Sequence, residues 1–143
     1  MDVDFVVRPD GIIEAHVEPC GGLLDEALND AISSRAPRGA VRQGLSTYWI
    51  DQTEARARRN AENGVSDRFA SGNVTYLRLE GSRVVVGYDF DPDEENAASL
   101  TLEDLLEFLA EYRQRVIDAG GASGSEASEM AEAEKVWPMG RAK

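Results

Sequence analysis

Cysteine and histidine are almost missing from this sequence. Among 143 residues there is one cysteine, Cys20, and one histidine, His16. A single cysteine excludes an intramolecular disulfide, which fits a reducing compartment. Catalysis by Cys20 would need a general base, and His16 is the only histidine available for that role. We therefore expect a buried or merely tolerated thiol rather than a nucleophile at position 20.

Long apolar runs and nucleotide-binding loops are missing as well. No stretch approaches the about 20 apolar residues that span a bilayer. The opening MDVDFVV is acidic and lacks the basic and apolar regions of a secretory signal. The segment GVSDRFASGN has neither dinucleotide nor Walker spacing. We expect a cytoplasmic protein with no cofactor.

Positive charge is scarce, and its distribution is uneven. The net charge is −12, and no Lys, Arg or His lies between Asp89 and Glu111. Such a balance argues against direct binding to nucleic acid or anionic membranes and favours a cationic partner. Residues 35–59, in contrast, contain six arginines against Asp51 and Glu54. The sequence therefore predicts a dipolar molecule.

The first half of the chain predicts a hairpin and two helices. Residues 3–8 and 12–17 are rich in β-branched side chains and flank the turn signal Pro9-Asp10-Gly11. Apolar residues at helical spacing predict a helix from Leu23 to near Ser34. Residues 47–50 predict a short strand, and Asp51 with Glu54 fits the capping of an exposed helix that ends near Asn63.

The second half predicts a tight hairpin, a helix and a tail. Residues 73–80 and 83–90 flank Gly81-Ser82, which suits a type II′ turn. Thr101 and Asp104 predict the start of an amphipathic helix with a leucine stripe. Beyond residue 119 the chain is poor in hydrophobic residues. We expect one domain over residues 1–119 and a flexible acidic tail over residues 120–143, in which Trp137 is anomalous.

Together these elements predict an α+β domain. We expect an antiparallel sheet built from the two β-hairpins, with residues 47–50 as the candidate link and about three helices packed mainly on one face. Val74 and Tyr76 compete with Leu77 and Leu79 for the inward side of the strand at 73–80. The expected core is Val3, Phe5, Val7, Ile13, Val17, Leu24, Leu28, Ile32, Leu77, Leu79, Val84, Val86, Leu102, Leu105, Leu109 and Val116.

Two segments invite a test for metal binding. In DFDPDEEN, an alignment with a calcium-binding EF-hand loop places Glu94 where glycine is needed and Leu100 where the closing Glu is needed. Glu14, His16 and Glu18 share one side of a predicted strand, but successive side chains there are about 7 Å apart. We therefore expect a solvated acidic loop and a solvated strand face, and no metal site.

The residues between Tyr88 and Glu111 predict a partner-binding surface. Nine carboxylates gather at a strand-to-helix junction and along the helix, and Tyr88, Phe90, Phe108 and Tyr112 are interleaved with them. Aromatic anchors inside a polar rim are typical of protein interfaces. A solvated helix face is the alternative interpretation of the charge run. The predicted site residues are Tyr88, Asp89, Asp91, Asp93, Glu94, Glu95, Glu103, Asp104, Glu107 and Glu111.

Residues 73–118, which begin with NVTYLRLEGSRVVVGYDFDPDEENAASLTLEDLLEFLAEYRQRV (residues 73–116), resemble the small acidic immunity proteins of polymorphic and contact-dependent bacterial toxin systems. The resemblance lies in a tight hairpin that runs through acids into a capped leucine helix. It implies a cytoplasmic, stoichiometric inhibitor, not an enzyme, whose acidic surface covers a basic toxin domain, often a nuclease.

Two other functions stay open. The protein is an adaptor or assembly protein, monomeric or homodimeric, if the tail with Trp137 recognises a partner. It is an enzyme of unrecognised type if convergent polar groups line a deep pocket. The small basic patch of Arg56, Arg58 and Arg59 is expected to be a solvated or internally paired face.

Overall fold

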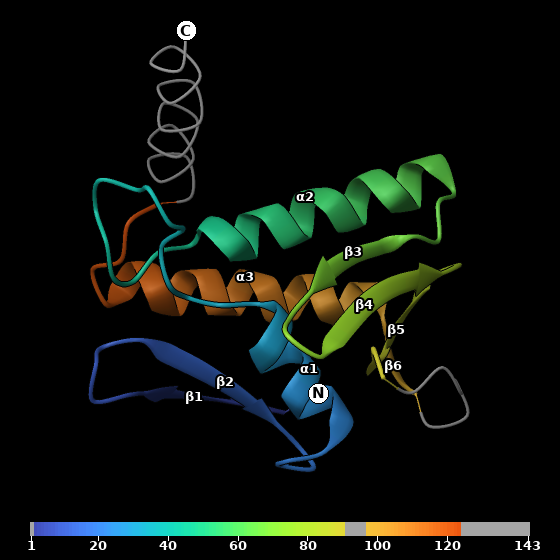
Figure 1. The fold of residues 1–143 in the computed structure, drawn as a ribbon, viewed down its shortest axis with the longest axis horizontal. Coiled ribbons are helices and arrows are strands. Elements are labelled where there is room, and N and C mark those ends of the chain that lie inside the picture. Colours follow the sequence, from blue (N-terminus) through green and yellow to red (C-terminus); the bar gives the residue numbers. More distant parts are fainter. Residues whose placement is uncertain (1, 91–96, 124–143) are drawn as a thin grey trace, which may run out of the picture.

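The computed structural model describes residues 2–90 and 97–123, which contain three helices and two antiparallel sheets (Figure 1). The predicted α+β class is therefore confirmed. None of the helices in these two ranges has the length and hydropathy needed to cross a membrane.

The smaller sheet is the predicted N-terminal hairpin. β1 (Val3–Val7) pairs antiparallel with β2 (Ile13–Val17), and Val3 lies opposite Val17. Gly11 closes the turn at φ 88°, and the Asp10 carboxylate accepts the Ile12 N–H at 3.1 Å. Buried apolar residues alternate along β2 with the half-buried Glu14 and His16, as the period of two predicts.

The larger sheet has four strands in chain order. β3 (Arg68–Ser71), β4 (Thr75–Glu80), β5 (Arg83–Tyr88) and β6 (Ala98–Thr101) form an antiparallel meander. The predicted β4–β5 hairpin is confirmed. Gly81 has φ 63° and no non-glycine residue among those described has positive φ, as a II′ turn requires. The flanking strands β3 and β6, of four residues each, were not predicted.

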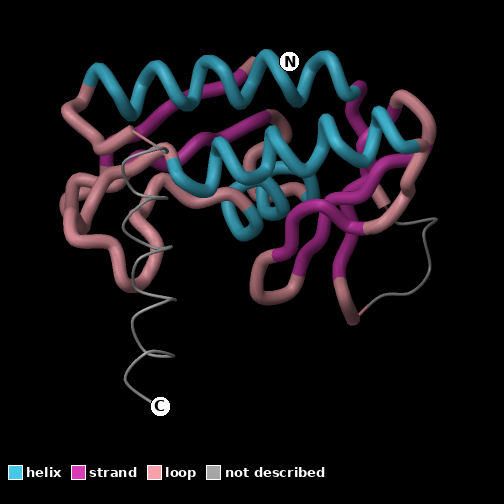
Figure 2. Tube along the Cα trace, turned by 90° about the horizontal axis from the view of Figure 1, so that it is seen from above, coloured by secondary structure: helices cyan, strands magenta, loops and turns pink. Residues whose placement is uncertain are grey.

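One helix packs against both sheets, and the other two pack against each other. α1 (Leu23–Ala31) contacts strands of both sheets. α2 (Tyr48–Asn63) and α3 (Leu102–Asp118) lie side by side and run in opposite directions (Figures 1 and 2). Arg113 of α3 joins the pair, because its guanidinium bonds the carboxylates of Asp51, at 2.6 Å, and Glu54. Thr101 caps α3 as predicted, since its hydroxyl accepts the Asp104 N–H at 3.0 Å.

Four predictions about the architecture were wrong. The two hairpins belong to separate sheets, because α1 packs between them and buries side chains against both. The helices accordingly do not all cover one face. Residues 47–50 form no strand: Thr47 precedes α2, and Ile50 in its first turn is fully buried. Burial of Ile50 outweighs the β propensity of Tyr-Trp-Ile. Asp51 is inside the helix and not its N-cap.

The predicted core is largely confirmed. Eleven of the sixteen residues are buried and Val3, Phe5, Leu24 and Leu102 are half-buried, while Val7 is wrong at 66% exposure. Val7 ends the first strand of a two-stranded sheet, where little covers it. In β4, Leu77 and Leu79 face the core. Tyr76 is also buried, with the Arg68 guanidinium 4.0 Å above its ring.

The packed part of the chain continues beyond residue 119. Ala122 is 1% exposed, donates to the Leu45 carbonyl at 2.9 Å and accepts the Thr47 N–H at 3.0 Å. The residues after Ser123, which include Trp137 and most of the predicted tail, lie outside the described ranges.

Asp30, near the end of α1, holds the turn before β4. Its carboxylate accepts N–H groups from Asn73, Val74 and Thr75 at 3.0–3.1 Å, and the Thr75 hydroxyl at 2.7 Å. Gly72 is needed beside it, because a Cβ there would lie 2.5 Å from the Asp30 carbonyl oxygen. Burial raises the pKa of Asp30, but the four hydrogen bonds together lower it below its ordinary value.

An Asp30→Asn substitution is therefore expected to destabilise the fold in a pH-dependent way. At pH 7 the free energy of unfolding should fall by about 1–3 kcal/mol, since charge-assisted hydrogen bonds are weakened. Because the folded pKa lies below the unfolded one, the carboxylate's contribution is complete above about pH 4 and is lost as the pH falls further. Urea unfolding from pH 7 to pH 3 should show the gap between wild type and variant closing. Asp67→Asn, at an exposed position, should have little effect, and a gap independent of pH would contradict the assignment.

Candidate partner-binding surface

Helix α3 has a buried face and an exposed face. Leu105, Phe108, Leu109, Tyr112 and Val116 are buried in the core. Glu103, Glu107 and Ala110 are exposed on another side of the same helix. This division follows the helical period of 3.6 residues.

A shallow groove runs along the first half of α3. It encloses about 650 Å³ and is lined by Ser82, Thr101, Leu102, Glu103, Leu106, Glu107 and Ala110. Leu102 and Leu106 are half-buried and also pack against the core. The spacing of four residues between Leu102, Leu106 and Ala110 is the signal in the sequence that places them side by side. The groove thus has an apolar floor and two glutamates beside it.

The predicted acidic residues are not equally available. Within residues 2–90 and 97–123, Glu103 and Glu107 form no ion pair, whereas Asp89 pairs with Arg68 at 2.5 Å and Glu111 with Arg115 at 3.5 Å. Asp104 is half-buried in the first turn of α3. Of these residues, Glu103 and Glu107 therefore present the least compensated negative charge. The predicted site residues Asp91, Asp93, Glu94 and Glu95 lie outside the described residues.

The aromatic residues divide into a surface pair and a core pair. Tyr88 stacks on Phe90 with 4.8 Å between ring centroids, and Phe90 is 71% exposed. The Tyr88 hydroxyl donates to the Glu26 carboxylate, and this hydrogen bond, with a smaller effect of burial, raises the pKa of Tyr88. Tyr88 is therefore already engaged within the molecule, while the Phe90 ring is accessible.

The expectation that Phe108 and Tyr112 lie on the surface was wrong. Both are 2% exposed and pack against Phe5 of β1. The Tyr112 hydroxyl donates to the Ile13 carbonyl at 2.8 Å, and burial raises the pKa of Tyr112 to about 12. These rings hold α3 against the small sheet. Because they are buried there, they are not accessible to a partner.

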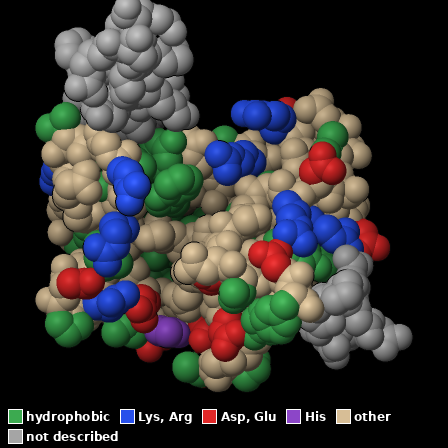
Figure 3. All heavy atoms as spheres, viewed as in Figure 1, with side chains coloured by type: hydrophobic (Ala, Val, Ile, Leu, Met, Phe, Trp, Pro, Cys, Tyr) green, Lys and Arg blue, Asp and Glu red, His purple; other side chains and the backbone are tan. Residues whose placement is uncertain are grey.

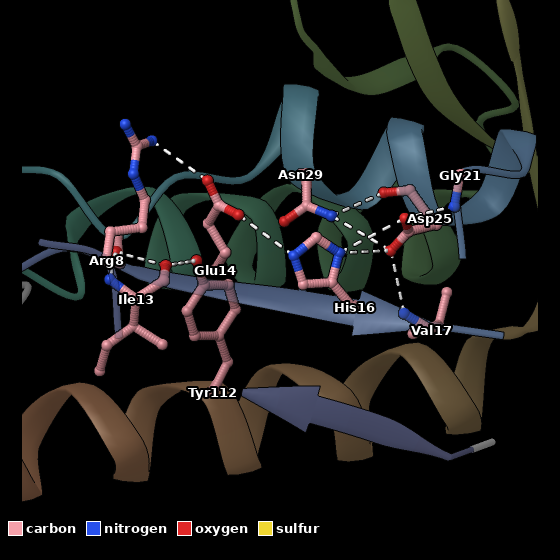
Figure 4. Close-up of polar contacts among 10 residues, drawn as sticks. Arg8, Ile13, Glu14, His16, Val17, Gly21, Asp25, Asn29 and Tyr112 are labelled. Carbon is pink, nitrogen blue, oxygen red and sulfur yellow. Dashed lines mark hydrogen bonds and ion pairs between the residues drawn. The ribbon is translucent and has the colours of Figure 1, made fainter. Parts of the chain in front are cut away.

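A polar cluster surrounds His16 (Figure 4). His16 Nδ1 faces Asp25 Oδ1 at 3.2 Å, and Nε2 faces Glu14 Oε2 at 3.1 Å. Burial lowers the pKa of His16, but the hydrogen bonds to Asp25 and Glu14 together raise it above its ordinary value. Glu14 also pairs with Arg8 at 3.1 Å. The predicted trio is thus altered: Glu18 is exposed and stands outside the cluster, whereas Asp25 belongs to it.

The sequence did not predict Asp25 as a site residue, because only the tertiary structure buries its side chain beside His16. The sequence indicates merely an acid in the first turn of a helix. The carboxylate accepts the Val17 N–H at 3.0 Å and the Gly21 N–H at 2.9 Å. Burial raises the pKa of Asp25, and these bonds together with His16 lower it by more. Asp25 thereby ties the end of β2 to the start of α1.

The same geometry bears on catalysis by Cys20. Cys20 is exposed, in the turn between β2 and α1. A cysteine nucleophile needs an imidazole nitrogen to take its proton. Both nitrogens of His16 already face carboxylates. The cluster is therefore not arranged as a Cys–His pair with one carboxylate behind the histidine.

Among the basic residues, Arg83 follows Ser82 of the groove and pairs with Thr101 in the sheet, and its guanidinium donates to the Ser99 hydroxyl. Arg58 bonds Glu54 at 2.9 Å, as expected for an internally paired face. On the face seen in Figure 3, Arg side chains lie along the left edge, over α2 and at the right, and Asp and Glu side chains lie mainly along the lower edge and at the right. This face therefore carries substantial positive charge although the protein is strongly acidic.

Comparison with models of protein families, with curated proteins and with solved structures found no match for this chain.

Substitutions in α3 should separate its two faces. Leu105→Ala is expected to lower the free energy of unfolding by about 2–5 kcal/mol, because Leu105 is fully buried and leaves a cavity. Leu106→Ala should cost about 1 kcal/mol or less, because the half-buried side chain already contacts solvent at the groove. Urea unfolding of both variants measures the difference. Equal losses would show that Leu106 is core and that the groove has no accessible apolar floor.

Proposed function

We propose that this protein is a stoichiometric binding module, not an enzyme, and that it captures a basic protein partner in the groove on α3. One observation carries the proposal: an apolar floor of Leu102 and Leu106 lies beside Glu103 and Glu107, which have no ion-pair partner among the described residues. Both kinds of contact that an interface needs are therefore present at one place.

The two kinds of contact serve different steps of binding. Exposed carboxylates on a molecule of net charge −12 attract a cationic surface and speed its association, an effect that salt weakens. Burial of the leucine floor supplies affinity once the partner has docked. Ala110 allows close approach at one end of the groove, because its side chain is a single methyl. A segment with aliphatic residues flanked by Lys or Arg fits this surface.

The resemblance of residues 73–118 to bacterial immunity proteins supports a more specific form of the proposal. The partner is then a basic toxin domain, such as a nuclease, and the protein neutralises it by covering its cationic site. Phe90, 71% exposed just after the end of β5 that lies away from Ser82, offers a second apolar contact separate from the groove.

Charge reversal at the groove tests the proposal. The partner to test is a basic C-terminal toxin domain encoded next to the gene for this protein, which this form of the proposal requires. A Glu103→Lys, Glu107→Lys double variant should associate with that domain about tenfold more slowly or worse at low salt, because attraction is replaced by repulsion. Stopped-flow association at several ionic strengths measures the rate, and co-expression measures protection of the host cell.

A matched control separates the local effect from that of net charge. Glu62→Lys, Asp67→Lys makes the same change of charge at two exposed positions on and after α2. This control should keep most of the association rate and the protection. If both double variants lose the same share of the association rate, the effect comes from net charge and not from the groove. Unchanged binding by the groove variant would refute the groove as the binding site.

A further inference from the structure

Three potential metal ligands meet beside the start of α1. His16, Cys20 and Asp25 each offer one ligand atom, and these three atoms lie within 4.8 Å of one another. They come from the end of β2, the following turn and the first turn of α1. Asp25 is buried, His16 is half-buried and Cys20 is exposed, so the cluster opens to solvent on the thiol side.

The distances fit a small tetrahedral ion after a modest adjustment. Zinc lies about 2.0–2.3 Å from nitrogen, oxygen and sulfur ligands, which places neighbouring ligand atoms about 3.3–3.6 Å apart. His16 Nδ1 and Asp25 Oδ1 are 3.2 Å apart, close to that spacing. Cys20 has to approach by about 1 Å. Because its side chain is exposed, rotation about χ1 meets little obstruction.

The second nitrogen of His16 has the partner that a metal-binding histidine requires. When Nδ1 carries the ion, Nε2 keeps its proton and donates to Glu14 Oε2, now 3.1 Å away. Glu14 is held in turn by Arg8 at 3.1 Å (Figure 4). A carboxylate behind the histidine fixes the tautomer and the ring orientation of metal sites. The ion would replace the proton on Nδ1, and it would lie to one side of the line from Nδ1 to Asp25 Oδ1, because 3.2 Å is too short to hold it on that line.

We propose that His16, Cys20 and Asp25 bind a divalent transition metal ion of the zinc class, with a fourth coordination position open to solvent. The mixed nitrogen, sulfur and oxygen set suits zinc and disfavours calcium or magnesium, which take oxygen ligands. The ion would clamp β2, the turn and α1 together. This site is independent of the groove on α3, so either proposal can fail without the other.

Cobalt provides a direct test on the full-length, reduced protein. Co²⁺ titration should produce a thiolate-to-cobalt charge-transfer band that saturates at one equivalent and disappears when Zn²⁺ is added. Cys20 is the only cysteine, so the band reports this thiol alone. Cobalt held by carboxylates elsewhere would give no such band.

Variants assign the ligands. His16→Gln and Cys20→Ser should each weaken zinc binding at least tenfold by calorimetry, and His16→Gln should also abolish a saturable band. Glu14→Gln should weaken binding about 10–100-fold through the histidine. Glu18→Gln, an exposed carboxylate beside the site, should bind as wild type does.

Thermal unfolding gives a second readout. Zinc at about 100 times its dissociation constant should raise the melting temperature of the wild type by about 5 °C or more and leave Cys20→Ser unchanged. Absence of a charge-transfer band at stoichiometric cobalt would overturn the proposal. A band or a zinc affinity unaffected by His16→Gln would overturn it equally.

Discussion

Two aspartates of α1 connect that helix to both sheets of the protein. Asp25 accepts N–H groups from Val17 and Gly21 at the end of β2, and Asp30 accepts those of Asn73, Val74 and Thr75 before β4. A carboxylate withdrawn from water is costly unless donors replace the lost hydration. Here backbone amides supply most of these donors, so each carboxylate holds a strand end in a defined place relative to one helix.

The position of α1 determines what the other helices have to cover. Because α1 packs between the sheets, the two sheets do not pair with each other. Helix α3 contacts both of them, through β1 of the small sheet and through β5 and β6 of the large one. Phe108 and Tyr112 supply its contacts with the small sheet. The opposite side of α3 has no such task. Its half-buried leucines and exposed glutamates therefore line the groove, which makes a binding role for that side physically reasonable.

Local patterns predicted the elements that have a strong period or a strong turn. Both hairpins, α1 and the capped start of α3 follow from alternation, from glycine in the turns and from Thr101. The short strands β3 and β6 carry no such pattern, and sheet pairing defines them. Residues 47–50 illustrate the converse, since a locally β-prone segment became helical to bury Ile50. Among the candidate site residues, the glutamates of α3 were predicted, whereas the groove required Ser82 and Thr101 from outside the helix.

Composition and periodicity by themselves determined the acidic character, the α+β class, the hairpins and most of the core, because these depend on near neighbours along the chain. The tertiary structure alone decided that the hairpins stay in separate sheets and that Phe108 and Tyr112 are interior. It also decided that Asp25, His16 and Cys20 meet, and that Asp89 and Glu111 are compensated while Glu103 and Glu107 are not. Burial and ion pairing join side chains from different elements, and sequence spacing carries no information on how those elements come together in space.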